Sequence, residues 1–206
     1  MEAVRHRCPE TTRQRLLEAA HREIYEHGYQ AASLDRILAD TGLSKGALYH
    51  HFGTKQALGL AVVNEVIGTR MQEEWIEPIQ QAQRPLQTII ELLGLKQKRA
   101  TEMSIRLGCD LNNLMQEMSP LDEAFRQSLA KVITQWRATL ESGLRRSREI
   151  GELRSGVDCA RTALFVVAAI EGCVGTSKNQ RSVEEHRDCL DGVKDYLYSL
   201  YAEGTR

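Results

Sequence analysis

Apolar residues recur every three or four positions along almost the whole chain, which is the period of an amphipathic α-helix. Serine, proline and glycine separate the successive segments, as they commonly do where helices start and end. Beyond Pro78 no turn-rich β pattern interrupts this periodicity. The sequence therefore predicts an all-α protein of about nine helices.

The predicted helices form two groups of different scale. The first group contains a helix over residues 11–27 and two short helices over 33–40 and about 44–51. A long helix from Thr54 to about Trp75 follows. The later helices are expected over residues 85–99, 105–118, 119–149, 158–176 and 182–201. We expect residues 1–55 to form a three-helix N-terminal domain and residues 56–206 to form a C-terminal helical bundle.

Composition narrows the class of protein. Charged residues make up 27% and hydrophobic residues 42% of the 206 residues, which is typical of a globular protein with a real core. The longest apolar run, Ala163–Ile170, is shorter than the roughly 18 residues of a membrane span. The start of the chain carries no apolar signal-peptide segment. We therefore expect a cytoplasmic protein with no membrane contact.

The five cysteines lie at positions 8, 109, 159, 173 and 189. Their odd number and wide spacing indicate neither a disulfide framework nor a zinc site. We expect free thiols in a reducing compartment, with no metal and no cofactor.

The two short helices flank a tight turn at Gly42, as a helix-turn-helix requires. Leu43, Leu48 and Phe52 are expected to point inwards. The second helix then exposes Lys45, Gly46, Ala47, Tyr49 and His50. Lysine reaches phosphates and guanine edges, the tyrosine hydroxyl bonds phosphates, and histidine can do either. Lys55 falls in the first turn of the next helix, where free N–H groups also favour a phosphate.

The sequence LSKGALYHHFGTKQAL, from Leu43 to Leu58, closely resembles the signature of TetR-family regulators. The resemblance extends over about residues 12–62 and implies a DNA-binding domain. Carried over to matching positions, it makes Ser33 a phosphate contact and Lys55 a clamp on the DNA backbone. The full set of expected DNA contacts is Ser33, Ser44, Lys45, Gly46, Ala47, Tyr49, His50 and Lys55. Ala47 departs from many relatives because it lacks a hydroxyl, so we expect it to offer only an apolar contact, such as to a thymine methyl.

The resemblance further implies a ligand-responsive, sequence-specific transcription regulator, most commonly a repressor that a small molecule releases from its operator. Its C-terminal helices would bind an unknown inducer and join two copies into a homodimer, so the double-stranded operator should be palindromic. Small and apolar residues on the last two predicted helices suit a four-helix bundle between two copies: Phe165, Ala168, Ala169, Gly172, Tyr196, Leu197 and Leu200. Ordinary packing within one chain is the alternative.

The segment Leu107–Leu114 resembles a Gly-Cys…Asn-Leu stretch found in a subset of TetR-like repressors, some of which sense electrophiles through the cysteine. Because a thiol near a helix N-terminus can have a lowered pKa, Cys109 is a candidate sensor; a structural cysteine is the alternative. The candidate ligand and sensor residues are Cys109, Asn113, Trp136 and Phe165. The apolar members of this set could equally be plain core.

We expect no enzymatic activity. The chain has no nucleophile elbow, glycine-rich phosphate loop or H-E-x-x-H motif. His50 and His51 are adjacent, so on a helix they point about 100° apart and cannot share a metal ion. The more distant alternatives are an enzyme that pairs Cys109 with His186 and a helical interaction protein.

Overall fold

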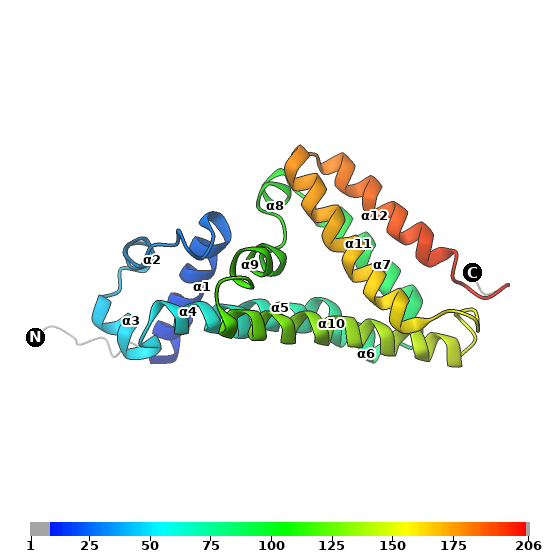
Figure 1. Cartoon of the computed structure of the whole chain (residues 1–206), viewed down its shortest axis with the longest axis horizontal. Coiled ribbons are helices and arrows are strands. Elements are labelled where there is room, and N and C mark those ends of the chain that lie inside the picture. Colours follow the sequence, from blue (N-terminus) through cyan, green and yellow to red (C-terminus); the bar gives the residue numbers. More distant parts are fainter. Residues whose placement is uncertain (1–8, 205–206) are drawn as a thin grey trace, which may run out of the picture. The chain divides into compact units, whose positions relative to one another are not determined.

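The computed structural model describes residues 9–204, and Cys8 lies outside this range with the rest of the first eight residues. Within residues 9–204 the chain forms helices and no named strand, which confirms the predicted all-α class (Figure 1). An isolated antiparallel bridge joins Leu153 and Tyr201. The helices in chain order are α1 (Pro9–His27), α2 (Leu34–Thr41), α3 (Lys45–Phe52), α4 (Lys55–Ala61), η1 (Val62–Ile67), α5 (Gly68–Met71), η2 (Gln72–Ile76), α6 (Glu77–Gln81), α7 (Pro85–Arg99), α8 (Glu102–Leu107), α9 (Asp110–Met118), α10 (Glu123–Glu149), α11 (Cys159–Gln180) and α12 (Val183–Tyr198).

Two predicted helices have different ends in the structure. The segments from α4 to α6 follow one another without a break, so the helix expected to end near Trp75 continues to Gln81 and includes two π-helical stretches. The helix expected over residues 105–118 is divided into α8 and α9. Gly108 lies between them with φ 76° and ψ −152°, a backbone conformation that side-chain-bearing residues rarely adopt.

Packing divides the chain into two compact units. The first contains the residues up to Thr69 together with Asn113–Leu129, and the second contains Arg70–Asn112 with Ala130–Arg206. Helices α9 and α10 each contribute residues to both units. The predicted boundary after residue 55 separates DNA binding from ligand binding and dimerisation. It stays a prediction, since the two compact units describe packing only.

In the first unit, α1 packs against α2, α3 and α4. Leu48 and Phe52 are 1% and 7% exposed, so they point inwards as the sequence predicted, whereas Leu43 is only half-buried. Gly59 allows the closest packing, because the ring of Tyr29 and that of Phe125 meet over it with centroids 4.5 Å apart.

In the second unit, α12 packs beside both α7 and α11 (Figure 1). A disulfide joins Cys173 on α11 to Cys189 on α12, with a Cα–Cα distance of 5.5 Å. The expectation that all cysteines are free thiols is therefore wrong for this pair. The two cysteines lie 16 residues apart in sequence, but the turn between the two helices brings them together.

Helix α11 contains 22 residues and a window with a mean hydropathy of 1.4, so its length and composition would allow it to cross a membrane. The helix is not one uninterrupted apolar run, since Glu171 falls within it. In the structure the inward face of α11 is part of the core, with Ala163 and Val166 almost fully buried.

We expect Gly59→Ala to lower the free energy of unfolding by about 1–3 kcal/mol, as overpacking a core does. An added Cβ would lie 2.6 Å from Tyr29 Cε2 and 2.7 Å from Phe125 Cζ, and neither ring can move freely. Gly94→Ala in α7 is the matched control, since its Cβ would meet nothing within 4 Å. Urea denaturation measures both, and equal effects of the two substitutions would contradict this account of Gly59.

Candidate functional site

The short helices α2 and α3 start at serine caps. Ser33 Oγ accepts a hydrogen bond of 3.4 Å from the Arg36 amide, and Ser44 Oγ accepts one of 3.2 Å from the Ala47 amide. Gly42 ends α2 in the left-handed conformation with φ 63°. Two of the predicted DNA contacts, Ser33 and Ser44, are therefore first of all the residues that fix where the helices of the motif begin.

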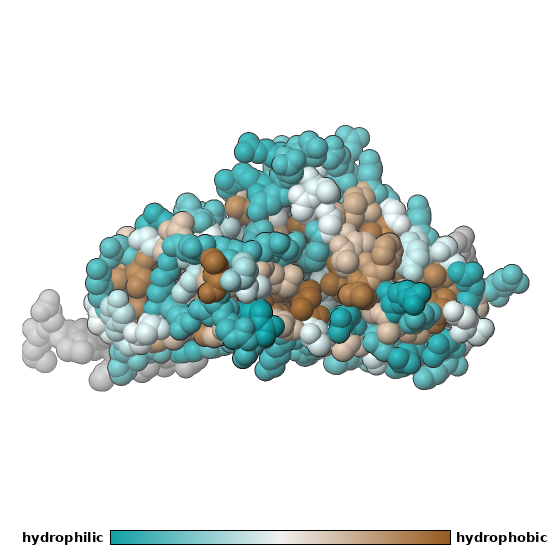
Figure 2. Space-filling model, viewed as in Figure 1, coloured by the Kyte–Doolittle hydropathy of each residue, from teal (hydrophilic) through white to brown (hydrophobic). Residues whose placement is uncertain are grey.

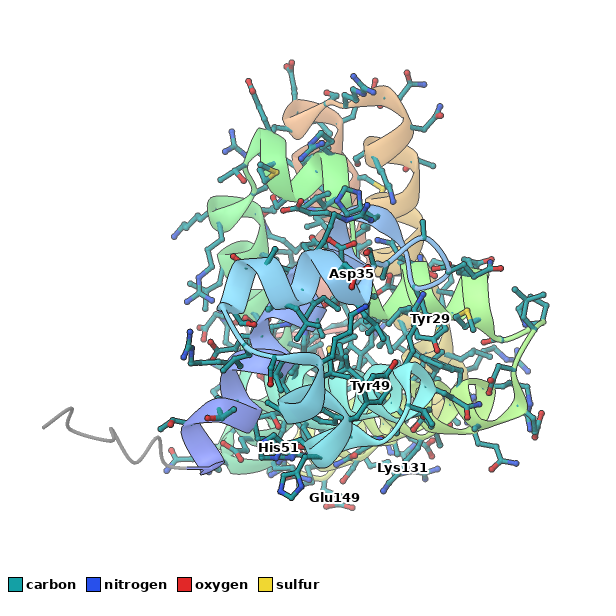
Figure 3. The ribbon with its side chains drawn as sticks, turned by 90° about the vertical axis from the view of Figure 1, so that its left-hand side faces the viewer. Tyr29, Asp35, Tyr49, His51, Lys131 and Glu149 are labelled. Atoms are coloured by element: carbon teal, nitrogen blue, oxygen red, sulfur yellow. A yellow bond between two sulfur atoms is a disulfide. The ribbon has the colours of Figure 1, made fainter. Side chains whose placement is uncertain are left out.

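Helix α3 turns one face to solvent. Among its predicted DNA contacts Ala47 is half-buried. The serine that caps the helix and the four other predicted contacts are exposed: Ser44, Lys45, Gly46, Tyr49 and His50. The Tyr49 side chain is 50% exposed although it is large and aromatic. Figure 3 labels Tyr49 and His51 on this helix and Asp35 on α2. An exposed helix of this size fits the major groove of B-DNA.

Lys45 is held by a carboxylate that the sequence analysis did not single out. Its Nζ lies 2.9 Å from Asp35 Oδ1, and both side chains are mostly exposed. The hydrogen bond that Lys45 donates to Asp35 is the largest cause that raises the pKa of Lys45. Lys45 is therefore a full positive charge whose present partner is another exposed side chain.

Lys55 belongs to a second arrangement, at the turn after α1. Its Nζ donates a 3.1 Å hydrogen bond to the Gln30 carbonyl and lies 5.0 Å from the centroid of the Tyr29 ring. The amides of Tyr29 and Gln30 both donate to the carboxylate of Glu117 on α9, at 2.9 and 2.8 Å. Glu117 thus fixes the turn at residues 29–30, and this turn positions Lys55. No local sequence pattern marks Glu117, because its partners lie 88 and 87 residues away.

Cys109 does not have the properties of a reactive thiol. Burial raises its pKa most, followed by the nearby charges of Glu171 and Asp110, and the net result lies far above the ordinary value. The prediction that the helix N-terminus lowers the pKa of Cys109 is therefore wrong. Since the thiolate is the nucleophile, this environment disfavours the electrophile-sensing alternative.

Glu171 on α11 is the most perturbed carboxylate beside Cys109. Burial raises its pKa to about 7, a hydrogen bond with Cys109 lowers it, Asp110 raises it and Lys96 lowers it. Its Oε2 atom is buried and has no hydrogen-bond partner. The charged and polar side chains linked to one another here are Arg70, Glu74, Lys96, Cys109, Asp110 and Glu171.

Trp136 on α10 is 2% exposed and packs against Trp75, with ring centroids 5.1 Å apart. Its Nε1 is buried without a hydrogen-bond partner. Of the other candidate ligand residues, Asn113 belongs to the first compact unit and Phe165 is 51% exposed on the surface of α11. The structure thus places Trp136 in the interior of the second unit, leaves Cys109 half-buried and leaves Phe165 on the surface.

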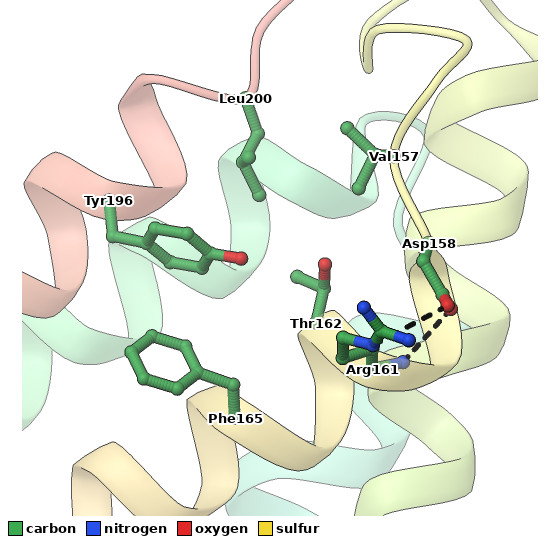
Figure 4. Close-up of a pocket in the computed structure, with 7 residues that line it drawn as sticks. All are labelled: Val157, Asp158, Arg161, Thr162, Phe165, Tyr196 and Leu200. Atoms are coloured by element: carbon green, nitrogen blue, oxygen red, sulfur yellow. Dashed lines mark hydrogen bonds and ion pairs between the residues drawn. The ribbon is translucent and has the colours of Figure 1, made fainter.

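The outer face of α11 and α12 is apolar and open. Figure 2 shows apolar residues gathered over α11, where Leu164 and Phe165 are 53% and 51% exposed. Phe165 and Tyr196 pack edge to face, with ring centroids 4.9 Å apart, and together line one side of an open hollow of ≈ 390 Å³ (Figure 4). These residues are available to a partner.

The other predicted interface residues divide between this surface and the core. Ala168 and Gly172 are exposed, and Ala169 is half-buried. Leu197 and Leu200 are 0% and 5% exposed, so assigning them to an interface was wrong. They pack inside their own chain because they lie on the inward face of α12 and just after its end.

Comparison with known proteins agrees with both parts of the chain. A family model described as "Bacterial regulatory proteins, tetR family" matches residues 16–62, and one described as "Tetracyclin repressor-like, C-terminal domain" matches residues 85–192.

Curated relatives match over most of their length. The HTH-type transcriptional repressor DhaR of Mycobacterium sp. (strain GP1) is 26% identical over 94% of this chain and 93% of its own. The HTH-type transcriptional repressor AcnR of Corynebacterium efficiens is 29% identical over 90% of this chain and 92% of its own.

Solved structures share the fold. A regulatory protein TetR from Rhodobacter sphaeroides has a TM-score of 0.78 and 25% identity over 92% of this chain and 98% of its own. A TetR transcriptional regulator from Chloroflexus aurantiacus has a TM-score of 0.81 and 24% identity over 94% and 97%. With its helix-turn-helix and helical body matched along nearly their whole length, the chain belongs to the TetR family of DNA-binding transcription regulators.

Proposed function

We propose that this regulator is a cytoplasmic repressor that binds a palindromic operator as a homodimer and leaves it when a small molecule binds in the helical body. The observation that carries the proposal is the exposed polar face of α3 opposite the buried Leu48 and Phe52. The relatives DhaR and AcnR are named as repressors, which supports repression over activation.

On DNA, Lys45 exchanges Asp35 for a phosphate or a guanine edge. The exchange is inexpensive, since exposed ion pairs contribute little to stability. Tyr49 and Lys55 bond phosphates, His50 bonds a phosphate or a base, and Ala47 meets a thymine methyl. Ser33 and Ser44 add hydroxyls and Gly46 allows close approach, so shape and half-site spacing supply part of the specificity.

A second copy of the chain is the partner proposed for the open apolar face of α11 and α12. Exposed large apolar residues side by side on one surface mark an interaction site. The proposed contacts are Phe165, Ala168, Ala169, Gly172 and Tyr196. A two-fold axis through this face gives two copies of α3 and hence a palindromic operator.

We expect Lys45→Ala and Tyr49→Ala to weaken operator binding about tenfold or more, since a good contact to DNA contributes about 1–3 kcal/mol. Lys131→Ala is the control, because Lys131 is an exposed lysine on α10 that does not belong to the helix-turn-helix. Fluorescence anisotropy with the upstream DNA of the gene, over a range of salt concentrations, measures the effect. Lack of any specific binding would contradict the regulator function, and unchanged binding by both variants would contradict the assigned face.

We expect Glu117→Gln to weaken operator binding and to speed hydrogen exchange at the Tyr29 and Gln30 amides. The carboxylate accepts from both amides, and hydrogen bonds to a charged group contribute about 1.5–3 kcal/mol each. Glu18→Gln on the exposed side of α1 is the control. Exchange rates followed by NMR test the local contact, and unchanged rates at both amides would refute it.

We expect Phe165→Glu, combined with Leu164→Glu, to convert a dimer into monomers and to reduce operator binding, since charges would be buried in the interface. Ile150→Glu is the control, because Ile150 is 57% exposed outside this face. Sedimentation velocity distinguishes the two states. A double variant that remains dimeric would show that the second copy binds elsewhere.

A further inference from the structure

Residues 33–55, which contain the helix-turn-helix, include two carboxylates, Asp35 and Asp40, and both lie on α2. Asp40 turns towards α1, where its Oδ2 lies 2.6 Å from Arg22 Nη2. Asp35 turns towards α3, where its Oδ1 lies 2.9 Å from Lys45 Nζ. The Asp35 side chain is 76% exposed, so its ion pair and not burial sets its direction. A carboxylate thus lies beside the first residue of the helix that is proposed to enter the groove.

A negative charge in this place is unfavourable for DNA binding in general. The phosphates repel it, and it pairs with a lysine that could otherwise bind them. Arg36, the residue after Asp35, is turned elsewhere, since its guanidinium donates to Glu23 and to the Ala31 carbonyl. A carboxylate can nevertheless contribute to the choice of sequence, because it accepts a hydrogen bond from the N4 amino group of cytosine.

The position of Lys45 favours contact with bases. In helix-turn-helix proteins the N-terminal residues of the recognition helix contact base edges. Lys45 is the first residue of α3, directly after the Ser44 cap. A lysine there can donate to both O6 and N7 of guanine. Because Asp35 lies at hydrogen-bond distance from Lys45, a base edge that the ammonium reaches is also close to the carboxylate.

The two side chains present a donor next to an acceptor, and a G·C base pair presents the complementary groups. Across the major groove its edge offers the N7 acceptor, the O6 acceptor and then the N4 donor. O6 and N4 are joined by a Watson–Crick hydrogen bond, which has the usual N–H···O length of about 2.9 Å. Lys45 Nζ and Asp35 Oδ1 lie 2.9 Å apart as well. An A·T edge places its donor between two acceptors, so an ammonium beside the carboxylate reaches only one of them.

We propose that Lys45 and Asp35 together read one G·C base pair in each half-site, which makes Asp35 a specificity-determining residue. Lys45 leaves Asp35 for O6 and N7 of the guanine, and Asp35 accepts from N4 of the cytosine in the same pair. Each side chain thereby exchanges its present partner for a group of the same hydrogen-bonding kind. This inference rests on the proposed function, since it requires that α3 enters the groove of an operator.

Selection from a random library of double-stranded DNA, followed by sequencing, tests the assignment. We expect the wild-type protein to select a palindromic motif with a G·C pair at one symmetric position. Asp35→Ala and Lys45→Ala should each lower the preference for this pair about tenfold, since a good base contact contributes about 1–3 kcal/mol. Tyr49→Ala should lower the affinity but keep the motif, because Tyr49 is proposed to contact phosphate. An Asp35→Ala protein that selects the same motif equally strongly would refute the assignment.

Asp40→Ala is the matched control. Like Asp35→Ala, it removes one exposed carboxylate of α2 and takes an ion-pair partner from one cation, Arg22 instead of Lys45. Both variants should bind DNA of mixed sequence more tightly, with a steeper dependence on salt concentration. Only Asp35→Ala should lose the preference for the G·C pair. An equal loss in Asp40→Ala would attribute the effect to net charge and overturn the proposal.

A modified base separates direct contact by Asp35 from an effect of Asp35 on the position of Lys45. The selected duplex is prepared with N4-methylcytosine at the assigned position, which still pairs with guanine but carries a methyl group in place of the N4 hydrogen in the major groove. We expect this change to weaken wild-type binding about tenfold and Asp35→Ala binding much less. Equal losses for the two proteins would refute the contact with cytosine. Unchanged binding by the wild-type protein would refute it without any variant.

The proposed function and the reading of the G·C pair fail in different ways. A wild-type protein that selects no motif contradicts operator binding itself. A palindromic motif without a position that depends on Asp35 contradicts only the role of Asp35 and Lys45 in reading it.

Discussion

Every helix leaves N–H groups without intrahelical partners at its start, and this constraint governs the architecture of an all-helical chain. Here hydroxyl and carboxylate side chains meet it: Ser33, Ser44, Thr54, Thr101, Asp158 and Ser182. The requirement is strictest in α2 and α3, which have eight residues each and are too short to be stable alone. Their caps fix the ends, and burial of Leu48 and Phe52 fixes the orientation of the exposed face.

Residues that fix the fold are thus also among the proposed DNA contacts. Ser44 begins α3, while Lys45, the next residue, pairs with Asp35. Several arginines of the first unit are paired in the same way, such as Arg36 with Glu23 and Arg22 with Asp40.

The sequence could predict features that depend on local order. The period of the apolar residues located the helices and placed Leu48 and Phe52 inside, because residues on the same face of a helix are buried together. It could not separate Leu197, which is core, from Phe165, which is exposed, since both lie at helical spacing among apolar residues. Periodicity could not predict the contacts of Glu117 and Glu171 or the Cys173–Cys189 disulfide, because each depends on a partner brought close only by the tertiary fold.

Helix α9 has a consequence for how the chain tolerates insertions and deletions. Asp110, which pairs with Arg70, begins it, and Glu117, which holds the turn after α1, lies two turns later in the same helix. One residue added between them would rotate Glu117 by about 100° around the helix axis relative to Asp110. Loops of the chain can change in length without such an effect. The contact of Asp110 and that of Glu117 thus both depend on the number of residues that separate them in α9.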